Sequence, residues 1–285
     1  MKLCRFLNPQ KQNRVGLITD DSTVLDLSAG NVECLATLLE SAELLAQLSK
    51  LARQNLPRHK LNEVKLLAPV DQQEVWAVGV TYLRSKKARM EESDFSASAY
   101  DKVYDAARPE LFFKSLPEKV VATADTVGIR KDARWNVPEP ELAFAINSRG
   151  QIVGYTIGND MSSRDIEGEN LLYLPQAKIY DRSCAVGPFI RVGVTEKEVR
   201  EWSIQIQIRR NGAAVFAGET SVSQIKRSFE ELVNYLFRSQ TFPHGAVLLT
   251  GTGIVPPDGF TLQPGDQIQI DISGIGRLEN SVVEV

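Results

Sequence analysis

The sequence is poor in the side chains that build thiolate and histidine metal sites. Its 285 residues include three cysteines and two histidines, and no two cysteines have CxxC spacing. An odd number of scattered thiols cannot form a disulfide framework or a thiolate zinc centre, and two histidines cannot supply a three-histidine site. Reduced thiols of this kind are typical of the cytoplasm, where we expect the protein to be. Carboxylate-based metal chemistry stays open.

Long apolar runs and an excess of one charge are also missing. No window approaches the roughly 20 apolar residues that span a bilayer, and the first residues lack the pattern of a signal peptide. Lys and Arg number 33 against 36 Asp and Glu, which gives a formal net charge of −3. Such a chain has no overall field to attract nucleic acid or an anionic membrane. We therefore expect neither as a partner. The 43% hydrophobic content excludes a disordered chain.

Hydrophobic patterns divide the chain into a short leading unit and a longer β-rich region. Short strand-like runs and a leucine-rich helical stretch at 32–52 predict a small α/β unit over residues 1–66, ending in a polar connector at 54–62. Strand patterns dominate residues 67–285, which form the second predicted domain. The expected fold class is α+β, because strands and helices do not alternate regularly. The predicted strands are 2–7, 14–19, 24–27, 75–80, 111–113, 142–146, 152–157, 189–194, 204–208, 215–218, 247–249 and 268–272.

Three local signals refine this outline. Surface helices are predicted within 83–107, where the residues are charged and rich in Ala and Met. Asn211-Gly212 between two strand patterns predicts a type I′ hairpin turn. Ser228 has capping-box spacing to Glu231 and predicts a helix that reaches about Arg238.

Two glutamates one residue apart are the most informative chemical feature. Glu139 and Glu141 flank Pro140 at the start of a strand pattern, so their side chains point to the same face. Pro140 cannot donate to a ladder, which predicts a sheet edge or a bulge here. If this strand pairs with 152–160 about the turn at 147–150, Asp160 falls level with Glu139.

Three carboxylates in one place repel one another unless a cation neutralises them. Hard oxygen ligands favour Mg²⁺, Mn²⁺ or Ca²⁺ over zinc. From the residues alone, the alternative stays open that Glu139 and Glu141 form a solvated pair on an edge strand and that Asp160 is unrelated.

Other candidate residues each have an ordinary structural explanation as well. Ser162 or Ser163 is a plausible N-cap for a helix through Leu172, and its N-terminus would suit a substrate carboxylate. Lys178 lies in an apolar context, where it either extends to the surface or anchors an anionic substrate and handles a proton.

Two further segments are equally ambiguous. Glu110 and Lys114 flank an apolar strand pattern. The turn at 250–253, Thr-Gly-Thr-Gly, is able to bring N–H groups and hydroxyls to a ligand, but it lacks the lysine and spacing of a phosphate-binding loop.

Taken in order, these motifs resemble the fumarylacetoacetate hydrolase-like family over roughly residues 64–285. The resemblance implies a mixed-β roll as the main domain and usually a homodimer, or a higher homo-oligomer. It also implies a divalent metal, Mg²⁺ with Mn²⁺ or Ca²⁺ as alternatives, bound by Glu139, Glu141 and Asp160. The motifs that carry it are Glu139-x-Glu141, Gly154-Tyr155-Thr156, Asn159 to Asp165, Lys178 and Gly187-Pro188.

Within that family, the runs 80–85, 102–114 and 169–180 are similar to sugar-acid dehydratases. This similarity implies a Mg²⁺-dependent hydro-lyase of pentose catabolism that removes water from 2-keto-3-deoxy-D-arabinonate to give 2,5-dioxopentanoate. By position in the motifs, Glu110 and Lys178 would handle protons. The residues that would position the substrate are Tyr82, Ser85, Lys114, Ser162, Arg164 and Thr252.

One departure from the family hydrolases bears on the reaction. Those enzymes carry a water-activating histidine shortly after a Gly-x-Asn-Tyr segment, whereas this chain has Thr81 for the asparagine and Ser85 in place of the histidine. A lyase needs no attacking water, so the absence favours dehydration. Two alternatives stay open. One is a metal-dependent hydrolase or decarboxylase of a short α-keto acid of the acylpyruvate or oxaloacetate type, with His244 reaching the site from a distant loop. The other is a binding protein that has lost catalysis.

Overall fold

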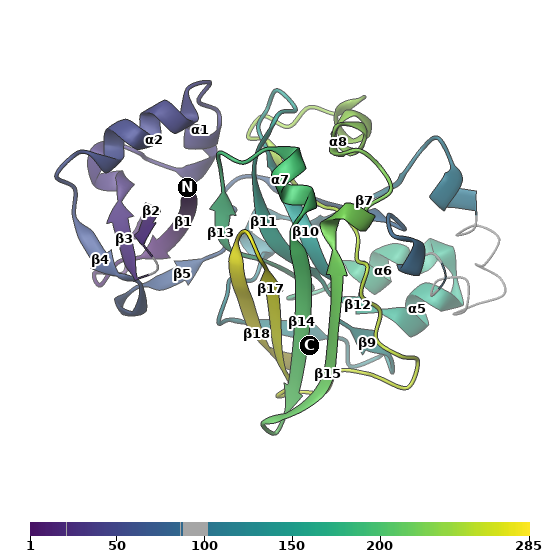
Figure 1. The fold of residues 1–285 in the computed structure, drawn as a ribbon. Coiled ribbons are helices and arrows are strands. Elements are labelled where there is room, and N and C mark those ends of the chain that lie inside the picture. The colour runs from purple at the N-terminus through teal and green to yellow at the C-terminus, as the bar shows by residue number, and fades with distance from the viewer. Residues whose placement is uncertain (21, 86, 88–101) are drawn as a thin grey trace.

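The computed structural model describes residues 1–20, 22–85, 87 and 102–285. Within them, two large sheets form the body of the molecule, and Figure 1 shows the leading residues at one side of it. The 11-stranded sheet has the order β4-β3-β2-β1-β13-β11-β10-β16-β6-β7, with β5 paired to β1. The five-stranded sheet has the order β15-β14-β17-β18-β8.

The strands of the larger sheet are β1 (Lys2–Leu7), β2 (Asn13–Asp20), β3 (Thr23–Asp26), β4 (Arg58–Lys60), β5 (Lys65–Leu67), β6 (Glu74–Gly79), β7 (Glu110–Ser115), β10 (Pro140–Ile146), β11 (Ile152–Asp160), β13 (Cys184–Arg191) and β16 (Ala246–Leu249). Those of the smaller sheet are β8 (Thr126–Ile129), β14 (Ser203–Arg210), β15 (Ala213–Ser221), β17 (Gln267–Ile272) and β18 (Gly276–Glu284), and a two-stranded pair joins β9 (Asn136–Val137) to β12 (Ser162–Ser163). The helices that the structure describes from end to end are α1 (Leu35–Leu39), α2 (Leu44–Ala52), α5 (Arg164–Glu169), α6 (Leu174–Lys178), α7 (Glu196–Arg200) and α8 (Phe229–Phe237).

The main core lies where the two sheets face each other. In β14, Ile204, Ile206 and Ile208 are buried while Gln205 is exposed, so one face packs inward and the other meets solvent. Every residue of β10 is buried, because this strand is covered on both faces. β16 pairs with β6 in parallel and β18 with β8 in parallel, whereas the other ladders are antiparallel. These mixed sheets with few helices confirm the α+β class and the mixed-β body.

The hairpin and capping predictions are confirmed. Asn211 and Gly212 have φ values of 51° and 83° between the paired strands β14 and β15, as a type I′ turn requires. Ser228 is the N-cap of α8, and its hydroxyl accepts the N–H of Glu231. Helix α8 ends at Phe237, with Arg238 as its C-cap.

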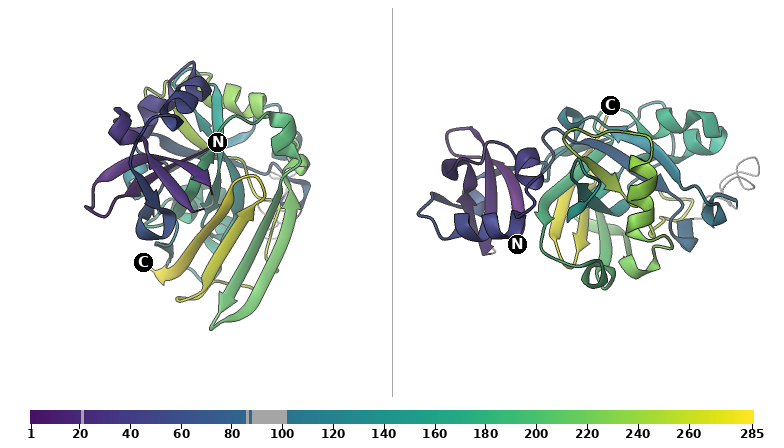
Figure 2. Two further views of the ribbon diagram at one scale, coloured as in Figure 1. Left: turned by 60° about the vertical axis from the view of Figure 1, so that its left-hand side comes forward. Right: turned by 90° about the horizontal axis from the view of Figure 1, so that it is seen from above.

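The leading residues extend the main sheet. β1 pairs with β2 on one side and with β13 on the other. The right-hand view of Figure 2 shows the leading residues, in purple, beside the rest of the molecule. Asp71 accepts the N–H groups of Leu35 and Ala36 at the start of α1. The carboxylate of Glu40, at the end of α1, accepts from the N–H and hydroxyl of Ser148 in the β10–β11 turn. The division of the chain at residues 66 and 67 stays a prediction.

Several local predictions need correction. β10 is an interior strand between β11 and β16, so Pro140 does not mark a sheet edge or a bulge; it is the first residue of the strand, where no ladder donor is missed. The helix that follows Ser163 ends at Glu169 and not at Leu172, because Asn170 has extended φ and ψ. The connector at 54–62 contains β4.

The helices predicted at 83–107 are described only in part. Residues 83–85 and 102–105 are helical, whereas residues 86 and 88–101 lie outside the described part of the chain. None of the described helices is long and apolar enough to cross a membrane.

Asp71→Ala tests the attachment of the leading residues. The variant removes the carboxylate that accepts two N–H groups at the start of α1. We expect the free energy of unfolding to fall by about 1 kcal/mol, the usual effect of losing a helix N-terminal acceptor. Urea denaturation checks this. Asp258→Ala, at an exposed position, is the control and should leave the transition unchanged.

Candidate active site

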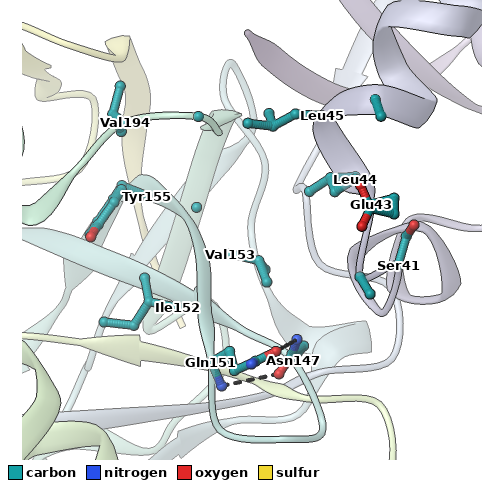
Figure 3. A pocket seen from close by; sticks show the side chains of 14 residues that line it. Ser41, Glu43, Leu44, Leu45, Asn147, Gln151, Ile152, Val153, Tyr155 and Val194 are labelled. Carbon is teal, nitrogen blue, oxygen red and sulfur yellow. Dashed lines mark hydrogen bonds between the residues drawn. The ribbon is translucent and has the colours of Figure 1, made fainter.

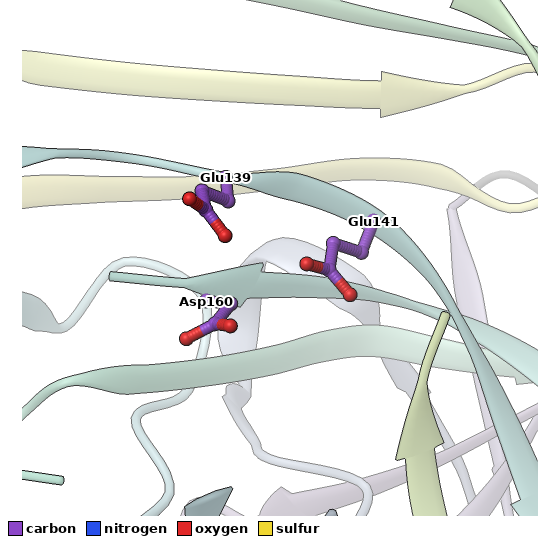
Figure 4. A group of neighbouring side chains, drawn as sticks. All are labelled: Glu139, Glu141 and Asp160. Carbon is purple, nitrogen blue, oxygen red and sulfur yellow. The ribbon is translucent and has the colours of Figure 1, made fainter. Parts of the chain in front are cut away.

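Three buried carboxylates meet where the β10–β11 hairpin opens (Figure 4). The register pairs Pro140 with Asn159, and the N–H of Asp160 donates to the carbonyl of Glu139 at 3.0 Å. Glu139, Glu141 and Asp160 each offer an oxygen, and these three atoms lie within 4.8 Å of one another. Their residues are only 3%, 1% and 1% exposed. The β10–β11 hairpin and the position of Asp160 level with Glu139 therefore agree with the sequence prediction. The alternative, in which Glu139 and Glu141 form a solvated pair on an edge strand, is wrong.

Buried cations neutralise two of the three carboxylates. The Nζ of Lys178, at the end of α6, lies 2.7 Å from Oε2 of Glu139 and 3.1 Å from Oδ2 of Asp160. The guanidinium of Arg164 lies 2.9 Å from Oε1 of Glu139. The Nζ of Lys114 lies 2.5 Å from Oδ1 of Asp160. Glu139 and Asp160 are thus each bridged by two side-chain cations.

Glu141 has a different environment. Its Oε2 accepts the N–H of Gly251 at 2.6 Å, and Gly251 has φ +89°, a conformation that favours glycine. Burial raises the pKa of Glu141 well above its usual value, and the charges of Asp160 and Glu139 raise it further. A nearby divalent cation would favour the charged form of all three side chains. The donor set, three oxygen ligands within reach of one point, fits Mg²⁺ or a similar hard ion.

The carboxylates open into a narrow, largely enclosed cleft. Two more acidic residues, Glu110 and Glu167, line it beside the three already described. The lining residues are Val78, Gly79, Val80, Ser85, Glu110, Phe112, Glu139, Glu141, Asp160, Glu167, Lys178, Gly251 and Thr252.

Four of the eight predicted catalytic and substrate-binding residues line this cleft. Glu110 is the first residue of β7, and Lys178 is the last of α6. The hydroxyl of Ser85 donates to the carbonyl of Tyr82 at 3.0 Å. The hydroxyl of Thr252 donates to the carbonyl of Ile254 at 3.2 Å, closing a small turn.

The other four are buried and are not among the residues that line the cleft: Tyr82, Lys114, Ser162 and Arg164. Lys114 donates to the carbonyls of Met161 and Lys178 in addition to its contact with Asp160. Ser162 donates to Glu167 at 3.0 Å. Burial raises the pKa of Tyr82, and the charge of Glu141 adds to this effect. These contacts orient the acidic residues, and a direct substrate role for the four stays a prediction.

Sequence reasoning missed Glu167. It is 3% exposed and lies in the first turn of α5. A usable signal was its spacing from Arg164, because residues three apart share a helix face and Arg164 points at Glu139. Phe112 was also missed; its ring centroid lies 5.8 Å from the Nζ of Lys178.

Neither histidine reaches the cleft. His59 lies in β4, where its Nε2 is 3.9 Å from Asp26 and its ring packs against Phe6. His244 is exposed and precedes β16, at the opposite end of that strand from Thr250 and the acidic cluster. The chain therefore offers no imidazole to activate water at this site.

A second groove lies between α2 and the β10–β11 hairpin, as Figure 3 shows. Among the described residues that line it, Glu43 is the one acidic residue, and Asn147 donates to Gln151 at 3.0 Å. It therefore lacks the cluster that marks the cleft.

The fold and the cleft define a class of protein. A model of the fumarylacetoacetate (FAA) hydrolase C-terminal family matches residues 74–283. The chain belongs to this family, which confirms the resemblance found in the sequence.

Three comparisons narrow the resemblance. The chain is 50% identical over 217 residues to the probable 2-keto-3-deoxyxylonate dehydratase of Haloferax volcanii, with 76% of this chain and 74% of the relative covered. It is 38% identical over 266 residues to the 2-dehydro-3-deoxy-D-arabinonate dehydratase of Saccharolobus solfataricus, with 92% and 89% covered. The solved structure of 2-keto-3-deoxy-D-arabinonate dehydratase complexed with magnesium and 2,5-dioxopentanoate superimposes with a TM-score of 0.82 at 34% identity, covering 100% of this chain and 99% of that one.

Lys178→Met tests the charge balance of the cluster without metal. The variant leaves Glu139 and Asp160 with one side-chain cation each in a buried setting. Breaking a buried pair costs about 3–5 kcal/mol, so we expect a loss of that order in the free energy of unfolding in EDTA.

Urea denaturation measures that loss. Lys65→Met, which breaks an exposed pair with Asp125, is the control and should cost less than about 1 kcal/mol. Equal losses in the two variants would contradict the charge balance described here.

Proposed function

We propose that this protein is a divalent-metal-dependent dehydratase that converts 2-keto-3-deoxy-D-arabinonate, a 2-keto-3-deoxy pentonate, to 2,5-dioxopentanoate. The observation that carries the proposal is the cleft itself. Three buried carboxylates, a lysine within hydrogen-bond distance of two of them and a further glutamate line one enclosed space without a histidine. The relatives and the magnesium-bound structure named above support the same reaction.

In this proposal Glu139, Glu141 and Asp160 bind Mg²⁺, with Mn²⁺ or Ca²⁺ as alternatives. The bound ion supplies Lewis-acid polarisation of the 2-keto acid group, which acidifies the C3–H bond. Gly251 supports this role by orienting Glu141 through its N–H. Lys178 and Arg164 support it by orienting Glu139.

Glu110 and Lys178 are the proposed proton-handling residues. One removes the proton from C3, and the other protonates the C4 hydroxyl as it leaves as water. A proton shift from C5 to C3 then gives an enol between C4 and C5, and transfer of the enol O–H proton to C4 gives the terminal aldehyde. Both side chains line the cleft, which supports their contact with substrate.

The remaining residues would position the substrate. Ser85 and Thr252 line the cleft and are proposed to contact it directly. Four buried residues outside the cleft lining are proposed to complete the binding site: Tyr82, Lys114, Ser162 and Arg164.

We also propose that the protein is a cytoplasmic homodimer or higher homo-oligomer. Exposed apolar side chains beside α6 support association. Leu172 is 83% exposed, Tyr173 37% and Ile179 38%. Light scattering coupled to size-exclusion chromatography measures the oligomeric state.

Product analysis by NMR tests the reaction. We expect the protein with Mg²⁺ to convert 2-keto-3-deoxy-D-arabinonate to 2,5-dioxopentanoate, and EDTA to abolish this because the carbonyl is no longer polarised. Acetylpyruvate should be untouched, since no imidazole is present to activate water. Cleavage of acetylpyruvate with the sugar acid inert would overturn the proposal in favour of a hydrolase.

Glu141→Gln tests the metal ligands. The substitution preserves shape and the acceptor for Gly251, but removes one anionic ligand. We expect Mg²⁺ affinity, measured by calorimetry, to fall at least about tenfold, and turnover at limiting Mg²⁺ to fall with it. Unchanged Mg²⁺ affinity and turnover would contradict the role of Glu141 as a metal ligand. Glu43→Gln, in the second groove, is the matched control.

A further inference from the structure

The carboxylate of Glu110 lies against the backbone of Gly79. Gly79 ends β6 and Glu110 begins β7, and the two residues are direct partners in the antiparallel pair. A Cβ placed on Gly79 would lie 2.7 Å from Cδ of Glu110 and closer still to its Oε2. This is well inside van der Waals contact between heavy atoms. The observed position of the carboxylate therefore requires a residue without a side chain at 79.

The backbone after Gly79 is held in an unusual conformation. Val80 has φ 53°, which is rare for a β-branched residue and persists only where the surroundings impose it. The hydroxyl of Thr81 donates to the carbonyl of Thr250 at 2.6 Å. The carbonyl of Thr81 accepts the N–H of Lys226 at 3.1 Å. The turn that carries Gly79 is thus fixed on both sides.

A methyl group at residue 79 would therefore move Glu110 and leave the turn in place. The atoms that it would meet belong to the far end of a flexible side chain, whereas β6 is paired with β7 and β16. Glu141 lies on β10, Asp160 lies on β11 and Glu139 directly precedes β10, so the geometry of this cluster does not depend on the contact.

We propose that Gly79 is a positioning residue that seats the carboxylate of Glu110 at the cleft. This inference rests on the proposed function, in which Glu110 handles a proton. It adds that the absence of a side chain at residue 79 determines where the carboxylate of Glu110 lies, and therefore where that proton is exchanged.

A double-mutant cycle tests the proposal, with Gly79→Ala made in the unchanged protein and in Glu110→Gln. In the unchanged protein we expect kcat to fall about 10²-fold, because a shift of about 1 Å in a reacting group has that effect. KM and Mg²⁺ affinity should stay within about threefold of the unchanged protein. In Glu110→Gln, Gly79→Ala should alter the residual kcat less than about threefold, since the group that it displaces no longer handles a proton.

Gly259→Ala is the matched control, since a Cβ there meets nothing within 4 Å and the residue has no left-handed φ. Thermal denaturation guards against a folding defect. If Gly79→Ala lowers Tm, Glu110→Ala in the same chain should restore it, because the carboxylate that the methyl group meets is then gone.

The outcomes separate the inference from the proposed function. An inactive Glu110→Gln with full activity in Gly79→Ala would overturn the positioning role alone, as would equal losses of kcat in both backgrounds. Full turnover in Glu110→Gln would overturn the assignment of Glu110 in the proposed function. A large loss of kcat when Gly79→Ala is made in the unchanged protein, with little change when it is made in Glu110→Gln, supports both the positioning role of Gly79 and the assignment of Glu110.

Discussion

The mutual repulsion of three buried carboxylates is the constraint on which the site depends. Carboxylates so close together cannot all stay charged in a protein interior without nearby cations. Lys178, Arg164 and Lys114 meet part of this requirement, and each reaches the cluster from a different element. Lys114 comes from β7, Arg164 from α5 and Lys178 from α6. The cluster therefore ties the ends of several elements to β10 and β11, and its electrostatics is part of the packing of the domain.

The three carboxylates of the cluster differ in the partners that contact them. Glu139 and Asp160 face side-chain cations, whereas Glu141 faces a backbone N–H and has a raised pKa. The first two are paired with side-chain cations on both sides. A cation placed among the three would act most strongly on Glu141, whose charged form has the least compensation. The cation pairs of Glu139 and Asp160 balance much of the charge of the cluster without a metal ion.

Features that depend on residues close together in the sequence could be predicted from it, whereas features that depend on distant residues could not. The i, i+2 spacing of Glu139 and Glu141 and the hairpin register to Asp160 are local, and both were predicted correctly. The placement of Pro140 was not, because a strand start and a sheet edge look the same until the neighbour β16, about 100 residues away, is known. The partners of Lys114 depend on how β7 packs, which no local pattern specifies. The family resemblance named Lys114 as a site residue but gave neither its partners nor Glu167.

Two glycines help to determine where two carboxylates of the site lie. Gly251 turns with a positive φ so that its N–H reaches Glu141, and Gly79 lacks the side chain that would displace Glu110. Thr81 joins these two positions, since its hydroxyl donates to Thr250 and lies where a Cβ on Gly251 would be. Two acidic groups on different strands are thus seated by one short stretch of backbone contacts. Because a hydrogen atom in place of a methyl group leaves no chemical signature, a comparison of charged residues alone would miss why these carboxylates lie where they do. In the proposed reaction, the geometry of proton transfer would therefore depend on the close approach of main chain to side chain as well as on the identity of the acids and bases.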